Sequence, residues 1–284
     1  MTGGLGFLGR VLTSRVGARA DEVVVYDAAQ GDDICDTDRL RDALRQGDTV
    51  FHLAGIRGAQ GEQDFDLALG VNLAGTRSVL EACRATRGCR LVFASTIAVF
   101  DARGRWEPRT TYGTTKAIGE LLVNDYARRG FVDGRGGRLA TIVIHPDAPV
   151  HSASGFASAL FRESLAGRDY TLPVALERRV PVIGVSTAAA CMIRLAEIAA
   201  EALGDDRTLT LPNLSVTVAE LADAARRAGA TGAITAARDP AVEAVMDAWP
   251  QEAPADRAIS LGFPRDASID SIVREYVGSA TLST

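Results

Sequence analysis

The sequence has no long apolar run, no excess of positive charge and no regular spacing of metal-binding side chains. No run approaches the ~20 apolar residues that a membrane-spanning helix needs, so we expect no membrane partner. The formal net charge is -5 and the basic residues are scattered, which argues against a nucleic-acid partner. Glycines follow the first two residues at once, so we also expect no secretory signal peptide.

Cysteine and histidine are scarce, with four and three residues respectively, and neither shows ligand spacing. A chain of 284 residues does not need a disulfide framework, so the cysteines favour a reducing, cytoplasmic location. His52 lies inside the apolar segment TVFHLAG, where a core histidine with satisfied hydrogen bonds is a better interpretation than a ligand. We therefore expect no bound metal.

Short apolar segments of strand length alternate with amphipathic helical segments as far as Pro146. We expect strands at residues 22–27, 49–55, 90–96 and 137–146, and helices at 7–20, 36–48, 64–88 and 114–130. Such alternation predicts right-handed crossovers and an α/β fold with a doubly wound parallel sheet of the Rossmann type.

Beyond Pro146 the elements become shorter and richer in alanine, serine and proline. A helix at 186–203 is expected to pack back on the sheet, whereas helical segments at 215–229, 239–250 and 268–278 are expected in a small mixed cap. We therefore predict a Rossmann domain over residues 1–147, rejoined by about 181–212, and a C-terminal substrate-binding cap over 148–284.

The opening MTGGLGFLGR contains a glycine pattern typical of loops that hold a dinucleotide pyrophosphate at a helix start. It fits G-x-G-x-x-G (Gly4, Gly6, Gly9) or T-G-x-x-G-x-x-G (Gly3, Gly6, Gly9). Asp27 follows Gly9 by 18 residues, near the position of the acid that accepts hydrogen bonds from the adenosine ribose. An acid there repels a 2′-phosphate, so NAD is predicted rather than NADP. These two features alone leave open a simpler interpretation, in which the glycines form a helix-entry turn and Asp27 is an unrelated turn aspartate.

Only Met1 and Thr2 precede these glycines, although such a loop normally follows a buried strand. Each apolar side chain of a central strand contributes ~1.5–3 kcal/mol when buried. We therefore expect a sheet that lacks its first strand in the sequence as written, and a physiological chain that begins a few residues earlier.

Tyr112 and Lys116 stand four residues apart in TYGTTK, which places them on one face of a helix. A free tyrosine titrates near ~10, too high for a base at neutral pH. A neighbouring ammonium favours the phenolate and lowers that pKa. The preceding strand ends in Ser95 and Thr96, at the sheet edge that faces a ligand, where a hydroxyl can hold a substrate oxygen. Together with the glycine loop, this order predicts oxidation of an alcohol by a nicotinamide.

The glycine loop, STIAVF and YGTTKAIGELLVNDY resemble the extended short-chain dehydrogenase/reductase family, the NAD-dependent epimerase/dehydratase group. The phrases SGFASALFRESLAG, LPNLSVTVAEL and SLGFPRDASIDSIVREY resemble its D-erythronate dehydrogenase subgroup. The resemblance implies NAD and the oxidation of a small sugar acid, D-erythronate, to its 2-oxo acid. It makes Tyr112 the catalytic base and Lys116 its partner on the nicotinamide ribose, with Thr96 in place of the usual serine.

The resemblance also implies a set of cofactor-binding residues, and Thr96 and Tyr112 as the residues that bind substrate. The implied cofactor-binding residues are Gly3, Gly6, Phe7, Leu8, Gly9, Asp27, Asp33, Ile34, Ala54, Asn72, Tyr112 and Lys116. Homodimers are usual in the family and often use the two long helices beside the sheet, so a homodimer is expected.

The chain departs from the subgroup in two places. His145, Pro146 and Asp147 stand where the subgroup usually has arginine, proline and glycine, and Asp101 stands where a glycine is usual. An arginine would help hold an anionic substrate, whereas Asp147 would repel one. Other arginines of the cap then become candidates for the carboxylate: Arg162, Arg168, Arg178 and Arg179. Two other functions stay open, a nucleotide-sugar epimerase or dehydratase and a catalytically silent NAD-binding protein.

Overall fold

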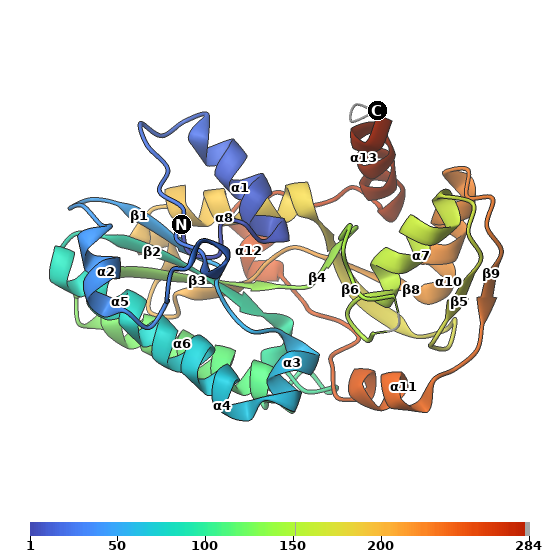
Figure 1. Cartoon of the computed structure of the whole chain (residues 1–284), viewed down its shortest axis with the longest axis horizontal. Helices are drawn as coiled ribbons and strands as arrows, with labels where there is room; N and C mark the ends of the chain where they lie inside the picture. Colours follow the sequence, from blue (N-terminus) through green and yellow to red (C-terminus); the bar gives the residue numbers. More distant parts are fainter. Residues whose placement is uncertain (151, 282–284) are drawn as a thin grey trace.

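The structure, a computed structural model, describes residues 1–150 and 152–281, and Figure 1 shows its elements. A parallel sheet has the order β1–β2–β3–β7, formed by β1 (Thr49–His52), β2 (Arg90–Thr96), β3 (Asp133–Leu139) and β7 (Thr208–Thr210). Beyond β1, Thr2 forms parallel bridges with both His52 and Tyr26. The predicted α/β class with a parallel Rossmann-type sheet is confirmed.

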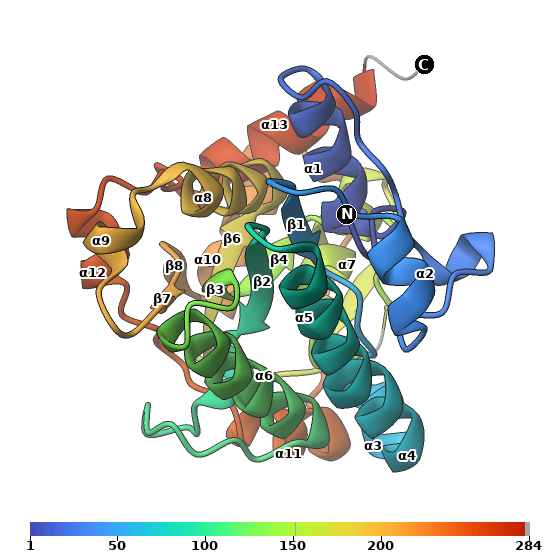
Figure 2. The ribbon, with the colours of Figure 1, turned by 90° about the vertical axis from the view of Figure 1, so that its left-hand side faces the viewer.

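Helices cover both faces of this sheet (Figure 2). Successive residues of a strand point to opposite faces. In β2, Val92 and Ala94 pack with α1 (Phe7–Gly17) and α8 (Val185–Glu197), whereas Leu91 and Phe93 pack with the other layer. That other layer contains α2 (Thr37–Asp42), α5 (Gly75–Thr86) and α6 (Thr111–Arg128). The expected return of the segment from 186 onto the sheet is confirmed in α8.

A second core lies on the right of Figure 1, around two small sheets. One has the order β4–β6–β8, formed by β4 (Thr141–Val143), β6 (Arg179–Gly184) and β8 (Leu214–Thr217). The other pairs β5 (Tyr170–Leu172) with β9 (Ile234–Ala236). The surrounding helices are α7 (Phe156–Leu165), α10 (Val218–Arg227), α11 (Pro240–Asp247) and α13 (Ile269–Thr281). The predicted division near residue 147 stays a prediction.

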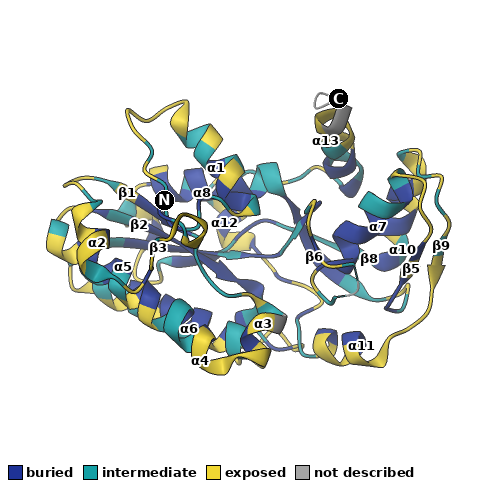
Figure 3. Ribbon diagram, viewed as in Figure 1, coloured by how far each residue is buried: buried dark blue, intermediate teal, exposed yellow. Residues whose placement is uncertain are grey.

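Short elements complete the described chain. They are η1 (Ala28–Gln30), α3 (Gly58–Gln63), α4 (Phe65–Ala68), the π-helical η2 (Leu69–Ala74), η3 (Ile97–Val99), α9 (Ala200–Leu203) and α12 (Asp256–Ser260). The expected helix at 64–88 is therefore three successive helical segments. Figure 3 shows that buried residues concentrate in the strands and on the inward helix faces. Among the described residues, no helix combines the length and the apolar character needed to cross a membrane.

The expected strand at 137–146 is wrong in its bounds. β3 begins at Asp133, and the chain then enters a different sheet as β4. The glycine-rich start of β3 accommodates a fully buried charge, Arg135, which pairs with Asp133 at 2.7 Å. Its guanidinium donates to the oxygens of Leu195 (2.8 Å) and Ile198 (2.5 Å) at the end of α8. Because these carbonyls lack helical partners, a cation stabilises the helix end there.

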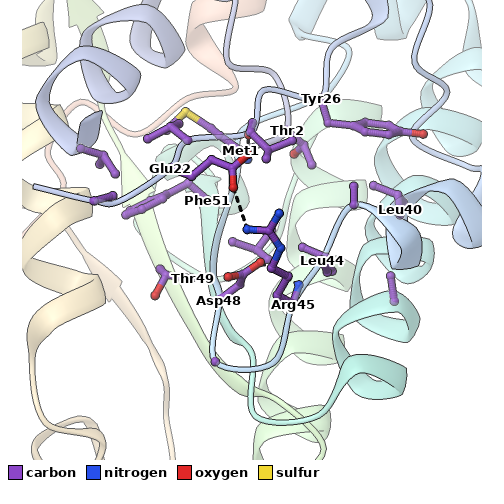
Figure 4. A pocket seen from close by; sticks show the side chains of 18 of the residues that line it. Met1, Thr2, Glu22, Tyr26, Leu40, Leu44, Arg45, Asp48, Thr49 and Phe51 are labelled. Carbon is purple, nitrogen blue, oxygen red and sulfur yellow. Dashed lines mark hydrogen bonds and ion pairs between the residues drawn. The ribbon is translucent and has the colours of Figure 1, made fainter. Parts of the chain in front are cut away.

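The expected strand at 22–27 forms a bridge only at Tyr26. A cavity of about 440 Å³ lies beside it, between residues 22–26 and β1, and α5 residues also line it (Figure 4). Met1 reaches into this space, where its ammonium donates to Val24 O at 2.6 Å, and burial lowers the pKa of the ammonium. Thr2 N donates to Phe51 O at 3.0 Å. Thr2 therefore bridges Tyr26 and β1, whereas the cavity separates residues 22–25 from β1.

Candidate active site

The glycine loop forms a tight turn between Thr2 and α1. Gly3 has a φ of +71°, and a Cβ there would lie 2.7 Å from Ala54 N. A Cβ on Gly9 would lie 2.2 Å from Gly3 O, so α1 packs directly on the turn. A Cβ on Gly6 would meet only Gly3 O, at 3.4 Å. A side chain at Gly3 or Gly9 would clash with nearby backbone atoms, so the turn requires glycine at both positions.

The same loop leaves the start of α1 free to bind an anion. Gly6 is the N-cap and supplies no side-chain cap, so the amides of Phe7 and Leu8 have no side-chain acceptor from it. Unpaired amides and the helix dipole favour a phosphate at such a position. Asp27 accepts hydrogen bonds from Leu5 N (2.9 Å) and Ala29 N (3.0 Å), which fixes its carboxylate against the loop. These residues fit the pyrophosphate and ribose of a dinucleotide.

The remaining predicted cofactor residues surround this loop and the end of β1. Ala54 lies against Gly3, since a Cβ on Gly3 would be 2.7 Å from Ala54 N. Asn72 is buried and clamps the chain after β1, accepting from Ile56 N (2.7 Å) and donating to Thr115 Oγ1 (3.2 Å) of α6. Asp33 and Ile34 follow the segment of Tyr26, the residue that bridges Thr2 at the edge of the sheet. The Tyr26 hydroxyl donates to Asp33 O at 2.8 Å, and Ile34 packs on Gly75 of α5.

Thr96 and Tyr112 meet at the carboxyl end of β2. Thr96 caps η3 by accepting from Ala98 N at 3.2 Å, which turns the chain away from the sheet. Thr110 caps α6 by accepting from Gly113 N at 3.0 Å, so Tyr112 lies in the first turn. Burial raises the pKa of Tyr112 above its ordinary value, whereas a hydrogen bond with Thr96 and the charge of Arg57 lower it. The two side chains are therefore adjacent.

Lys116 lies one turn further along α6 and is 4% exposed. Its Nζ donates to Ala94 O at 2.9 Å and lies 4.7 Å from the centre of the Phe93 ring. A Cβ on Gly55 would lie 3.5 Å from the same Nζ. Burial lowers the pKa of Lys116 to about 8, opposed by the charge of Glu120. Lys116 is also the only lysine among the 31 basic residues, which distinguishes it in the sequence from every other cation.

His52 is a core residue, as predicted. Its Nδ1 lies 2.7 Å from Thr2 Oγ1 and its Nε2 lies 2.9 Å from Thr76 Oγ1. It is fully buried, and desolvation lowers its pKa to about 3. The interpretation of a core histidine with both ring nitrogens satisfied is confirmed. His52 thereby joins Thr2, at the glycine loop, to Thr76 of α5, whose hydroxyl lies 2.6 Å from Asn72 O.

The cap arginines are mostly neutralised by acids. Arg168 pairs with Glu163, and Arg178 pairs with Asp247. Arg179 lies 3.7 Å from Glu252, and its guanidinium also donates to the backbone of Ser215. These three residues are poor candidates for a substrate carboxylate because their charges already have partners.

Arg162 is also engaged, but it lies beside the segment that departs from the subgroup. It donates to Pro146 O at 2.8 Å and pairs with Glu163 at 3.0 Å. The His145 ring lies 4.3 Å from the Phe7 ring at the start of α1. Asp147, expected to repel an anion, is exposed, and its amide donates to His145 Nδ1 at 3.0 Å. The segment after β4 thus contacts the glycine-loop helix directly.

Two charged groups near the site were not predicted. Glu120 is buried on α6 one turn beyond Lys116, a spacing visible in the sequence as K-x-x-x-E. Arg57 follows the β1 segment, and its charge acts on both Tyr112 and His145. Within the described part of the chain, no carboxylate pairs with Arg57. No sequence pattern singled out this arginine from the others.

The fold, the glycine loop and the Thr96–Tyr112–Lys116 group define a dinucleotide-binding protein of the Rossmann class. Residues 1–206 match the model of the NAD dependent epimerase/dehydratase family. The chain belongs to this family, and the predicted cofactor, NAD, is confirmed.

Named relatives include two D-erythronate dehydrogenases. The protein of Cupriavidus necator is 41% identical over 265 residues, which cover 88% of this chain and 82% of that protein. The protein of Haemophilus influenzae is 31% identical over 307 residues, which cover 98% of each chain. A crystal structure of a nucleoside-diphosphate-sugar epimerase from Agrobacterium tumefaciens superposes with a TM-score of 0.89 at 32% identity, covering 100% of this chain and 94% of that one.

Proposed function

We propose that the protein is an NAD-dependent dehydrogenase that oxidises D-erythronate to 2-dehydro-D-erythronate. The observation that carries this proposal is the contact between Thr96 and Tyr112, with Lys116 one turn further along α6 and close to Gly55. The similarity to two D-erythronate dehydrogenases over most of the chain supports the substrate.

In this proposal, Tyr112 is the base. Its phenolate takes the proton of the substrate C2 hydroxyl, while the Thr96 hydroxyl holds the same oxygen as it becomes a carbonyl. NAD⁺, when bound, accepts the hydride that leaves C2. Lys116 stabilises the phenolate by its charge and binds the nicotinamide ribose. The burial of Lys116 and the partial burial of Tyr112 favour this charge interaction, because Coulomb interactions are stronger away from bulk water.

The cofactor would be held by the uncapped start of α1 and by Asp27. We assign the pyrophosphate to the amides of Phe7 and Leu8 and the adenosine ribose to Asp27. The other predicted contacts, at Asp33, Ile34, Ala54 and Asn72, belong to the same proposal.

We further assign the substrate carboxylate to Arg57. The cap arginines have acidic partners, whereas Arg57 has none in the described part of the chain and its field reaches Tyr112. A guanidinium binds a carboxylate through two parallel hydrogen bonds. Arg57 would therefore bind the substrate carboxylate. In the subgroup an arginine after β4 would do so, at the position where this chain has His145.

A homodimer in the cytoplasm completes the proposal. Exposed apolar side chains on the layer of α4 and α6 support a dimer, namely Phe65, Leu67 and Leu121, with exposures of 57%, 38% and 55%. All four cysteines are free, which fits a reducing compartment. Light scattering tests the dimer, and Leu121→Glu should reduce its molar mass to that of a monomer if α6 forms the interface.

The test of the function is NADH formation from D-erythronate and NAD⁺. We expect turnover with D-erythronate and none with a nucleotide sugar. The similarity to a nucleoside-diphosphate-sugar epimerase structure favours an epimerase as the second candidate. Epimerisation of a UDP-sugar, with no oxidation of any sugar acid, would establish that candidate instead. A Tyr112→Phe variant that keeps the cellular function would indicate a silent NAD-binding protein.

A further inference from the structure

Glu120 forms the centre of a buried polar cluster beneath the proposed catalytic residues. It is 2% exposed, and its carboxylate accepts from Arg138 Nη2 at 2.7 Å and from Arg138 Nε at 2.9 Å. The Ser95 hydroxyl donates to one oxygen, and Trp106 Nε1 lies 3.3 Å from the other. These donors come from β2, β3 and the loop before α6, so one carboxylate joins three parts of the fold to the helix of Tyr112.

The cluster surrounds the Glu120 carboxylate with a cation and further hydrogen-bond donors. An unpaired buried carboxylate costs several kcal/mol in lost hydration, so it needs a cation and further donors. Arg138 supplies the cation with a bidentate contact, and its side chain is 14% exposed. Each carboxylate oxygen then has an additional donor. The Glu120 carboxylate therefore has hydrogen-bond partners on both oxygens without using Lys116.

Lys116 has few other charges around it. On its own helix Glu120 acts on it and Tyr112 lies one turn before it, and from β1 it faces His52, which is neutral because burial lowers its pKa to about 3. The loop after β1 and η2 contribute uncharged groups, Gly55 and Asn72. β2 contributes the Phe93 ring and the Ala94 oxygen. Glu120 is thus the negative charge that acts on Lys116, and Arg138 on β3 is the cation paired with Glu120.

We propose that Glu120 is a positioning residue for the reaction: it anchors α6 to β2 and β3, and its negative charge keeps Lys116 protonated beside Tyr112. The proposal rests on the function proposed above and deepens it. Ser95 and Thr96, adjacent on β2, then have separate tasks. Ser95 holds the helix through Glu120, and Thr96 faces the Tyr112 hydroxyl.

The single lysine allows a test that does not depend on turnover. In protein labelled with ¹³C at lysine Cε, one resonance reports the ionisation of Lys116. We expect Glu120→Gln to lower the Lys116 pKa by about one unit, a tenfold increase in the neutral form at a given pH below the transition. We expect Arg138→Gln, which removes the opposing cation, to raise that pKa. Ser95→Ala keeps both charges and should leave it unchanged.

Kinetics supply the second readout. If Lys116 loses charge, Tyr112 is harder to ionise, so the rising limb of kcat against pH for D-erythronate should move upward by about one unit in Glu120→Gln. The KM should change by less than about threefold, since Glu120 does not touch the substrate. Glu120→Asp, which keeps the charge, should restore the limb. Glu107→Gln, at an exposed acid in the loop before α6, is the control and should resemble wild type.

The outcomes separate the two proposals. A wild-type protein that oxidises no sugar acid overturns the proposed function, and the lysine titration still decides the role of Glu120. An unchanged Lys116 pKa in both Glu120→Gln and Arg138→Gln overturns the present inference, even if both variants are less stable. If Glu120→Gln does not fold, the opposite shift expected in Arg138→Gln remains the test.

Discussion

The open space below Thr2 makes a quantitative prediction about stability. The cavity of about 440 Å³ is lined by Val24 and Tyr26 on one side and by Val50 and Phe51 on the other. In the described structure, Val24 O accepts from Met1 N, and no other backbone group of residues 22–25 forms a backbone hydrogen bond. A four-residue extension, Val-Ile-Val-Val, placed before Met1 should enter this space as a parallel strand.

The expected change in the free energy of unfolding is the balance of three contributions. Each buried side chain contributes ~1.5–3 kcal/mol. Ordering each residue costs ~1–2 kcal/mol in backbone entropy, and each ladder hydrogen bond returns ~1 kcal/mol. For a four-residue strand these terms sum to an increase of about 7 kcal/mol in the free energy of unfolding, which for a chain of this size corresponds to a rise in Tm of about 15 °C.

The assay is thermal unfolding of the parent chain beside two extended variants. A Gly-Ser-Gly-Ser extension of equal length is the matched control, because it has the same backbone but no apolar side chains. We expect the valine-rich extension to raise Tm and the control to leave it unchanged. Equal effects of the two extensions, or no effect of either, would refute the reasoning that an apolar strand fits this space.

Three further predictions concern single side chains. Gly9→Ala should weaken NAD⁺ binding and destabilise the fold by ~1–3 kcal/mol, because its Cβ would lie 2.2 Å from Gly3 O. Gly70→Ala, in open space, is the control, and equal losses in both variants would argue against the cradle. The pKa of His52 in the fold, about 3, lies below the unfolded value of 6.5. The stability it contributes is therefore present above pH 6.5 and is lost toward pH 3, by ~1.4 kcal/mol per pH unit. Denaturant titrations should show this slope reduced in His52→Gln, and an unchanged slope would assign it to other groups. Arg57→Ala should raise the KM for D-erythronate by about 10–100-fold and leave that for a neutral tetritol unchanged. A larger rise in the KM for NAD⁺ would assign Arg57 to the cofactor.

Local patterns were sufficient to predict the glycine loop, β2 and the Tyr112–Lys116 helix. β2 is a continuous apolar run with the bounds expected for it, and α6 has its cap at Thr110, one turn before the expected start. The buried histidine was also predictable, because the apolar residues around His52 leave no room for a hydrated ion. In these cases the signal and the structure it specifies lie within one segment of the chain.

Other features depend on contacts between distant segments. The start of β3 contains glycines and Arg135, a pattern that does not indicate a strand, and the charge is tolerated only because α8 ends against it. Residues 22–25 have a strong strand pattern, but in the described structure only Val24 O among their backbone groups has a backbone partner, Met1 N. The roles of Glu120 and Arg57 likewise require the positions of Arg138 and Tyr112, which sequence spacing does not supply.

The central claim is that Tyr112 removes the proton in the oxidation of D-erythronate by NAD⁺. The most direct test compares kcat for NADH formation in the wild type and in Tyr112→Phe, with NAD⁺ binding measured for both proteins. The account predicts a decrease in kcat of ~10²–10⁴-fold with NAD⁺ binding retained. A Tyr112→Phe variant that oxidises D-erythronate at the wild-type rate would contradict it.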